Sequence, residues 1–241
     1  MTTINRNKLK HLYAQVAPGE PVTSERLAQL GVSADLAVHY VRAGWLARLA
    51  RGVFRRPEQS VSLHASLKLL ESRIEGLHVG GKSALDWHGV RQYVTQLEML
   101  HLFGWVTGRL PEWFVQEFPA EYHRKRLFNE QPTALLHVVL FENRHEAPLV
   151  STPERALLEM LSEVGVRQPI QEARELMESC YNLRGAVLQE LLLHCNSVKT
   201  VRLCLQLGRE LSLPWVAKLS PDVLPTGRGH PSAQDVLVLK P

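Results

Sequence analysis

The chain has 241 residues, of which 45% are hydrophobic and 22% are charged, and this composition is that of an ordinary soluble globular protein. The length accommodates one large domain or two ordinary ones. No apolar run approaches the roughly 18 residues of a membrane-spanning helix, and the N-terminus lacks the apolar core of a signal peptide. We therefore expect a cytoplasmic protein without membrane partners.

The basic charge is concentrated in the first quarter of the chain. Residues 1–57 contain nine Lys and Arg against three Asp and Glu, a net charge of +6, whereas residues 58–241 contain 19 against 21, a net charge of −2. An excess of this kind is the electrostatic footprint of an element that binds the phosphates of nucleic acid.

Residues 8–55 predict three helices followed by a hairpin. Apolar side chains recur at helical spacing over residues 8–16, and two short helices follow with a break at residues 30–33. Gly31 suits the turn between them because glycine tolerates positive φ, and Ser33 can cap the second helix. Residues 45–55 alternate in character and turn back at Gly52, as in a two-stranded hairpin. Helix, turn, helix and hairpin indicate a winged helix-turn-helix domain that binds DNA.

The candidate DNA-binding residues follow from the faces of these elements. Apolar spacing predicts that Ala37, Tyr40, Val41 and Gly44 face the core. The candidates for contact with base edges in the major groove are then Ser33, Ala34, Asp35, His39 and Arg42. The candidates for contact with phosphates or the minor groove are Arg48, Arg51, Arg55 and Arg56. The alternative is a winged helix used only for protein contacts, with the arginines as a solvated face.

A short polar segment at residues 57–60 predicts a domain boundary, with a DNA-binding domain at residues 1–58 and a mixed α/β domain at residues 59–241. Strand candidates in the second domain are Leu97, residues 99–103, 113–115, 126–128, 135–141 and 149–150. Helix candidates are residues 151–164, 170–181, 185–194 and 198–211, the first with Ser151 and Glu154 at the spacing of a capping box. The fold class is α+β, a winged helix-turn-helix domain followed by a domain with a sheet and a C-terminal helical bundle.

Residues 76–83, GLHVGGKS, match the phosphate-loop pattern G-x-x-x-x-G-K-S. That chemistry needs a buried strand directly before the first glycine, so that backbone N–H groups surround the phosphates. Residues 70–75 instead continue a helical pattern and contain three charges. We therefore expect a loop followed by a helix from Ser83 to Gly89, and we keep a nucleotide-binding enzyme as the less favoured alternative.

The second domain shows no convincing active site. Its histidines have no metal-binding spacing, and we interpret Glu142, His145 and Glu146 as a solvated loop. The three cysteines, at positions 180, 195 and 204, fit neither a zinc site nor a disulfide framework and are expected to be buried thiols. We identify no catalytic residue, metal ligand or cofactor, and we expect a protein that is not an enzyme.

The motifs together resemble the AbiEi family, antitoxins of abortive-infection, type IV toxin–antitoxin systems. The resemblance rests on the segments GVS, HYVRAGWLARLARGVFRRP, HVGGKSALDWHGV, LHLFG, LPEWF, STPERALLEML and ELLLHCNSVKTVRLCL, and covers nearly all of residues 8–218. The chain departs from the family at the C-terminus, where the expected basic, glycine-containing strands are reduced to residues 224–230.

The resemblance implies a winged helix followed by an α/β antitoxin domain. The winged helix would bind inverted repeats of double-stranded DNA in its own promoter and repress it. The second domain would counteract a co-encoded nucleotidyltransferase-like toxin without a stable complex. The alternative is an antitoxin that masks its toxin by direct binding.

Overall fold

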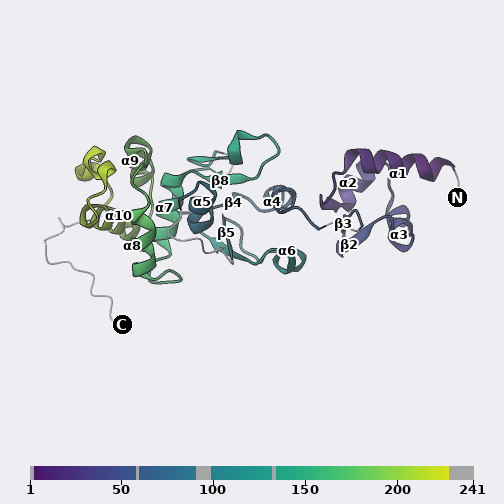
Figure 1. Ribbon diagram of the computed structural model, residues 1–241, viewed down its shortest axis with the longest axis horizontal. Helices are drawn as coiled ribbons and strands as arrows, with labels where there is room; N and C mark the ends of the chain where they lie inside the picture. The colour runs from purple at the N-terminus through teal and green to yellow at the C-terminus, as the bar shows by residue number, and fades with distance from the viewer. Residues whose placement is uncertain (1–2, 58–59, 91–98, 132–133, 228–241) are drawn as a thin grey trace.

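The computed structural model describes residues 3–57, 60–90, 99–131 and 134–227. Along the long axis, the N-terminal region comes first, then the larger sheet, then the C-terminal helices (Figure 1). Helices occur together with two separate sheets, and α7 to α10 follow the last strand, which confirms the α+β class. Among the described residues, no helix is long and apolar enough to cross a membrane. The strand candidate at Leu97 lies outside these residues.

The N-terminal region, called here the head, follows the expected order. Its elements are α1 (Thr3–Gln15), β1 (Val22–Thr23), α2 (Ser24–Gln29), α3 (Ala34–Arg42), β2 (Ala47–Ala50) and β3 (Val53–Arg55). Thr23 caps α2 by accepting a hydrogen bond from the N–H of Arg26 at 3.2 Å, and Ser33 caps α3 by accepting from Leu36 at 3.3 Å. Gly31 has φ +78°, as the turn between the two helices requires.

The predicted two-stranded hairpin is present as β2 and β3, and a third strand, β1, extends it to a three-stranded sheet. Its order is β1-β3-β2, and β1 pairs antiparallel with β3. The third strand is only two residues long, too short to produce an alternating pattern in the sequence. It joins the start of the helix-turn-helix motif to the hairpin, because its last residue, Thr23, is also the cap of α2.

The core of the head forms around α3. Leu12, Leu27, Tyr40, Leu46 and Phe54 pack in one buried cluster. Ala37 and Tyr40 are buried as predicted, but Val41 is only half-buried and Gly44 is exposed. The prediction of four core-facing residues is wrong at Gly44. Helix α3 ends at Arg42, and Gly44 lies in the turn that follows, with φ +73°.

The larger sheet is mixed, as predicted, with the order β6-β5-β4-β8-β7. Its strands are β4 (His78–Val79), β5 (Leu100–Gly104), β6 (Ala120–Arg124), β7 (Val138–Leu140) and β8 (Leu149–Ser151). The pairs β4–β8 and β5–β6 are parallel, whereas β4–β5 and β7–β8 are antiparallel. Neither the short central strand β4 nor the edge strand β6 was predicted.

Two of the strand predictions are wrong. Residues 113–115 belong to the helix α6 (Glu112–Glu117), which starts directly after Pro111 and buries Trp113 and Phe114. Residues 126–128 form no strand, and Phe128 makes only a single bridge to Cys195. Short apolar runs do not distinguish a strand from a buried helical turn, and both errors come from runs of three residues.

The remaining helices are α4 (Leu63–Glu71), α5 (Gly81–Trp87), α7 (Pro153–Ser162), α8 (Ile170–Glu178), α9 (Gly185–Leu193) and α10 (Val198–Glu210). The helix α7 lies at their centre and is buried along nearly its whole length. It packs against α5 and β8 of the sheet layer and against α8, α9 and α10 on its other side (Figure 1). All three cysteines are buried free thiols, as predicted.

The head touches the second domain through the back of its hairpin. Val53 is 3% exposed and belongs to the large core cluster, against which Leu49 and Ala50 also pack. Beside this contact the N–H of Ser62 donates to the carbonyl of Gly19 at 2.8 Å. The hairpin therefore presents one side to the second domain and leaves the other to solvent.

Replacing Tyr40 by Ala should unfold the head. The ring is fully buried, so its loss leaves a cavity that costs about 3–5 kcal/mol of unfolding free energy, extrapolating from buried Phe. Chemical denaturation followed by tryptophan fluorescence measures this loss. Val38→Ala is the matched control on the same helix, because Val38 is 39% exposed and its change should stay within about 0.5 kcal/mol. Equal effects of the two changes would show that the helix is rotated from the described position.

Candidate functional site

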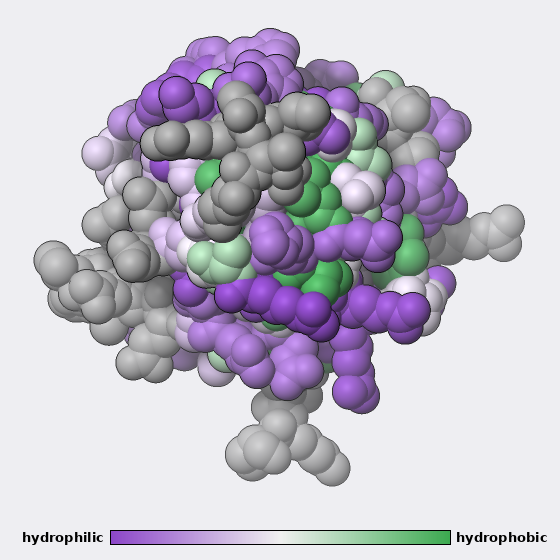
Figure 2. All heavy atoms as spheres, turned by 90° about the vertical axis from the view of Figure 1, so that its right-hand side faces the viewer, coloured by the Kyte–Doolittle hydropathy of each residue, from purple (hydrophilic) through white to green (hydrophobic). Residues whose placement is uncertain are grey.

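The outer face of α3 carries the predicted base-contacting residues. Their side chains are all exposed: Ser33, Ala34, Asp35, His39 and Arg42. Ser33 uses its oxygen to cap the helix, and the His39 ring meets Trp45 edge-on at 6.2 Å. Seen from the head end, the surface is mostly hydrophilic, with a small apolar area near its centre (Figure 2). The structure thus leaves all five residues accessible to solvent.

The hairpin arginines divide into two groups. Arg48 and Arg51 are exposed, whereas Arg55 and Arg56 are half-buried. The Arg48 guanidinium lies 5.7 Å from the centroid of the Phe54 ring, so its stem covers the hairpin while its charge stays in water. Arg51 lies at the tip of the hairpin, between β2 and β3, where a wing can approach a phosphate backbone.

Arg56 has a structural function that the sequence did not reveal. Its guanidinium lies 4.3 Å from the centroid of the Tyr13 ring and donates to the carbonyls of Tyr13 and Val16 at 3.5 and 3.4 Å. Those carbonyls are at the C-terminal end of α1, where a cation is favoured by the helix dipole. Arg56 therefore fastens the first helix to the end of the hairpin.

The phosphate-loop pattern has another explanation in the structure. The strand β4 lies inside the pattern, not before it, and α5 begins at Gly81, two residues earlier than predicted. The Gly81 N–H, which would face a phosphate, donates to the carboxylate of Glu159 at 3.1 Å. Lys82 pairs with Glu172 at 2.9 Å, and the Ser83 hydroxyl accepts from the N–H of His101 at 2.8 Å. These groups are all engaged within the chain.

The two glycines of the pattern make room for Glu159. A Cβ at Gly80 would lie 2.3 Å from the Glu159 carboxylate, and Gly81 has φ +52°. Both features let the backbone pass directly over a buried carboxylate. The helix N-terminus is thus an anion site whose anion is a side chain of the protein.

Glu159 is the centre of a buried ionic network. Its carboxylate is 2.8 Å from His78 Nε2, 2.7 Å from Arg155 Nε and 2.8 Å from the hydroxyl of Ser151. Burial alone would raise the pKa of Glu159, but attraction to His78 and Arg155 and their hydrogen bonds lower it to about 2. The group therefore stays ionised in the interior at neutral pH.

Arg155 extends the network to the loop that follows β6. It donates to both carboxylate oxygens of Glu130, at 2.7 and 2.8 Å, and to the carbonyl of Leu136 at 2.6 Å. A bidentate pair of this kind fixes the orientation of the Arg155 guanidinium as well as its distance from the carboxylate. The predicted capping box is wrong, because Ser151 belongs to this network and Thr152 is the N-cap of α7. Glu154 binds Arg184 instead, at 2.8 Å.

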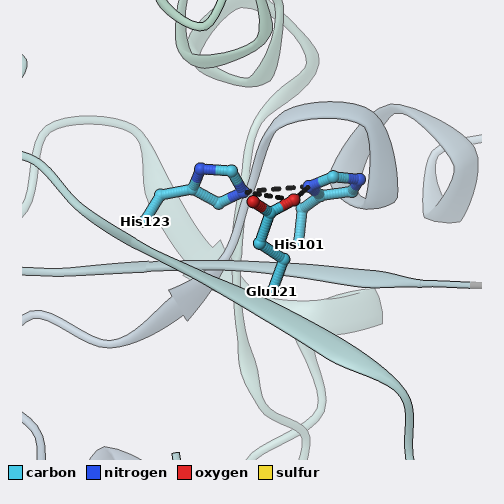
Figure 3. Close-up of side chains that lie close together, drawn as sticks. All are labelled: His101, Glu121 and His123. Atoms are coloured by element: carbon cyan, nitrogen blue, oxygen red, sulfur yellow. Dashed lines mark hydrogen bonds and ion pairs between the residues drawn. The ribbon is translucent and has the colours of Figure 1, made fainter. Parts of the chain in front are cut away.

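A cluster of two histidines and one glutamate was also not foreseen. His101 on β5 and Glu121 and His123 on β6 turn their side chains toward one another (Figure 3). The histidines stand far apart in the sequence, and they meet only because β5 and β6 pair in parallel. No spacing rule within a single segment detects such a set. Glu142 and His145, by contrast, are exposed, as expected of a solvated loop.

The family of the chain follows from comparison with family models. The model described as "Transcriptional regulator, AbiEi antitoxin N-terminal domain" matches residues 5–96, and the model described as "Transcriptional regulator, AbiEi antitoxin, Type IV TA system" matches residues 97–236. The head has the element order of winged helix-turn-helix proteins. The chain belongs to the AbiEi family of type IV antitoxin transcriptional regulators, which is not a class of enzymes.

A comparison with solved structures identifies a protein of similar fold. The crystal structure of the RV2827C protein from Mycobacterium tuberculosis superposes with a TM-score of 0.55 at 15% sequence identity. The match covers 90% of this chain and 80% of that one. A comparison with curated proteins found no match.

Glu159→Gln should destabilise the second domain by about 3–5 kcal/mol, because it removes the buried anion that His78 and Arg155 share and leaves Arg155 with Glu130. The pKa of Glu159 falls from 4.5 to about 2 on folding. Its stabilisation is therefore complete above pH 4.5 and is lost as the pH falls toward 2. Urea unfolding across pH 3 to 7 should show a weaker pH dependence in the variant.

The matched control is Glu142→Gln, which removes an ion pair between two exposed side chains. It should change stability by less than about 1 kcal/mol at any of these pH values. If Glu159→Gln lowered the free energy of unfolding equally little, Glu159 would not be the centre of the buried network.

Proposed function

We propose that the protein is a DNA-binding autorepressor that also counteracts a co-encoded nucleotidyltransferase-like toxin, and that it catalyses no reaction itself. Family membership supports the regulatory and antitoxin functions. The observation that supports DNA binding is the exposed face of α3 beside an exposed, arginine-bearing wing in a head of net charge +6. A regulator of this kind works in the cytoplasm, on the promoter of its own operon.

The geometry suggests how the head would meet duplex DNA. In helix-turn-helix proteins, the second helix enters the major groove with its N-terminal residues at the base edges. In this chain that position belongs to Ser33, Ala34 and Asp35, with His39 and Arg42 one and two turns along. Arg48 and Arg51 would then reach the phosphates on either side, which orients the head without reading sequence. Arg55 is a weaker candidate since it is half-buried, and Arg56 is the weakest because it already holds α1.

Binding to DNA should depend steeply on salt, and Arg51 should contribute to that dependence without contributing to specificity. Each neutralised phosphate contributes about −0.9 to the slope of log affinity against log salt. Arg51→Ala should therefore reduce the magnitude of the slope by about 0.9 and weaken binding to promoter and random DNA equally. Fluorescence anisotropy with labelled duplexes from 50 to 300 mM salt measures both quantities.

Arg42→Ala should have the opposite pattern, a loss on promoter DNA of roughly 1–3 kcal/mol with little change on random DNA. His39→Ala tests the same face. A matched control is Arg144→Ala, which removes an exposed arginine outside the head. If Arg42→Ala and Arg51→Ala weakened both DNAs by the same factor, base reading by α3 would be refuted.

The antitoxin function is proposed to lie in the second domain. We place the boundary at residues 58–59, where the net charge changes from +6 to −2. The match to the N-terminal family model extends further, to residue 96, and so includes the helix α5 and the strand β4 of the larger sheet. We propose that antagonism of the toxin needs no stable complex. Direct masking of the toxin is the competing mechanism.

Repression and protection should be separable in the full-length protein. With the toxin expressed from an unrelated inducible promoter, the double variant Arg42→Ala/Arg51→Ala should protect cells as well as the unchanged protein while failing to repress a reporter. Protection that disappears in the double variant would show that antitoxicity requires the DNA-binding face of the head. If the unchanged protein also failed to protect against a toxin made from an unrelated promoter, antitoxicity would be transcriptional silencing alone. Co-purification of a tagged toxin with the protein in moderate salt would favour direct masking instead.

A further inference from the structure

The cluster of His101, Glu121 and His123 lies on one face of the larger sheet. In the parallel pair of β5 and β6, His101 is level with Glu121, and Phe103 is level with His123. Residues two apart on a strand point to the same side, so all three side chains share a face. The Phe103 and His123 rings stack at 4.6 Å, which holds the second imidazole in place.

The ligand atoms of the three residues converge on a single point (Figure 3). His101 Nδ1 and His123 Nε2 are 2.9 Å apart, and Glu121 Oε2 is 3.9 Å from each of them. Ligands around a tetrahedral Zn²⁺, with bonds of about 2.0–2.2 Å, lie roughly 3.3 Å from one another. The three observed separations bracket that value. A cation would replace the hydrogen bond that joins the two rings and would need only small side-chain adjustments. From this convergence we infer that His101, Glu121 and His123 bind a divalent transition-metal ion of the zinc type.

Second contacts orient each ligand. Glu163 Oε2 lies 3.3 Å from Nδ1 of His123, the ring nitrogen that faces away from the cluster. A bound cation would select the tautomer in which His123 donates its Nδ1–H to Glu163 and directs the Nε2 lone pair at the cluster, as around metal-bound histidines. That tautomer replaces the one in which Nδ1 accepts from Arg167 Nη1. Arg167 Nε holds the far oxygen of Glu121 at 2.9 Å and leaves Oε2 directed at the rings.

Two positively charged side chains, Arg167 and Lys82, lie near the proposed metal site. Arg167 Nη1 lies 3.3 Å from both His123 Nδ1 and Glu163, and Lys82 is in the wall of the same cavity. Each of these cations already has an acidic partner: Glu121 and Glu163 for Arg167, and Glu172 for Lys82. The small cavity lined by His101, His123 and Arg167 leaves space beside the two histidines for a water molecule.

The site would have a structural consequence. Among the residues that the structure describes, β6 is an edge strand and pairs with β5 alone. A cation held by one residue of β5 and two of β6 would cross-link this edge strand to its neighbour. It would also draw on Glu163 and Arg167, which follow α7, and so join the sheet edge to the helical layer.

The test is a titration of the untagged, full-length protein after removal of metals with a chelator. Zn²⁺ is titrated against a chromophoric competitor, and Co²⁺ is followed by its visible absorption, which reports nitrogen and oxygen ligands. We expect one equivalent of either ion to bind and the melting temperature to rise with Zn²⁺. His101→Gln and Glu121→Gln should each weaken binding at least tenfold and abolish the shift in melting temperature.

The matched control is His145→Gln, which removes an exposed histidine outside the cluster and should bind metal like the unchanged protein. Glu121 is partly exposed, so its variant is expected to fold, and a cooperative melt without metal verifies this. The inference is overturned if no stoichiometric binding occurs, or if Glu121→Gln and His101→Gln bind Zn²⁺ as tightly as His145→Gln. These outcomes are independent of DNA binding and of toxin antagonism.

Discussion

The second domain depends on one buried anion. Glu159 lies inside the protein, and a buried carboxylate without partners would cost far more than the marginal stability of a domain. Its partners come from four separate pieces of the chain: His78 on β4, Gly81 at the start of α5, Ser151 at the end of β8 and Arg155 on α7 itself. The hydrogen bonds to Glu159 can therefore all form only when the larger sheet, α5 and α7 are in place together.

This constraint also accounts for the phosphate-loop pattern. The glycines allow the backbone to approach Glu159, the serine hydroxyl supports the backbone of β5, and the lysine pairs with α8. A short strand followed by glycines and a helix N-terminus is a general way to bind an anion. In this protein the anion is the side chain of Glu159, so the phosphate-loop pattern stabilises the fold. The two histidines of the inferred metal site stand on β5, which pairs with β4, and on β6 beyond it.

The sequence predicted the elements whose signals are local. The helices α2 and α3 have their capping residues, Thr23 and Ser33, and the glycine of the turn between them within a few residues. The helices α7 to α10 show long apolar stripes. It did not predict β1 and β4, which are two residues long, or β6, whose residues alternate without strong apolar character. It also could not show that His101 and Glu121 are neighbours, because strand pairing joins residues that no periodicity connects. The contacts of Arg56 with α1 were not predicted for a related reason, since its partners are about 40 residues away.

The account of function depends most on α3 entering the major groove upstream of the protein's own reading frame. Hydroxyl-radical footprinting of that DNA with the full-length protein tests it most directly. Two copies reading inverted repeats should protect two half-sites on one face of the duplex, about 10–10.5 base pairs apart or a multiple of that distance. Uniform protection along the fragment, or none at salt concentrations where the protein is folded, would contradict sequence-specific binding by the head.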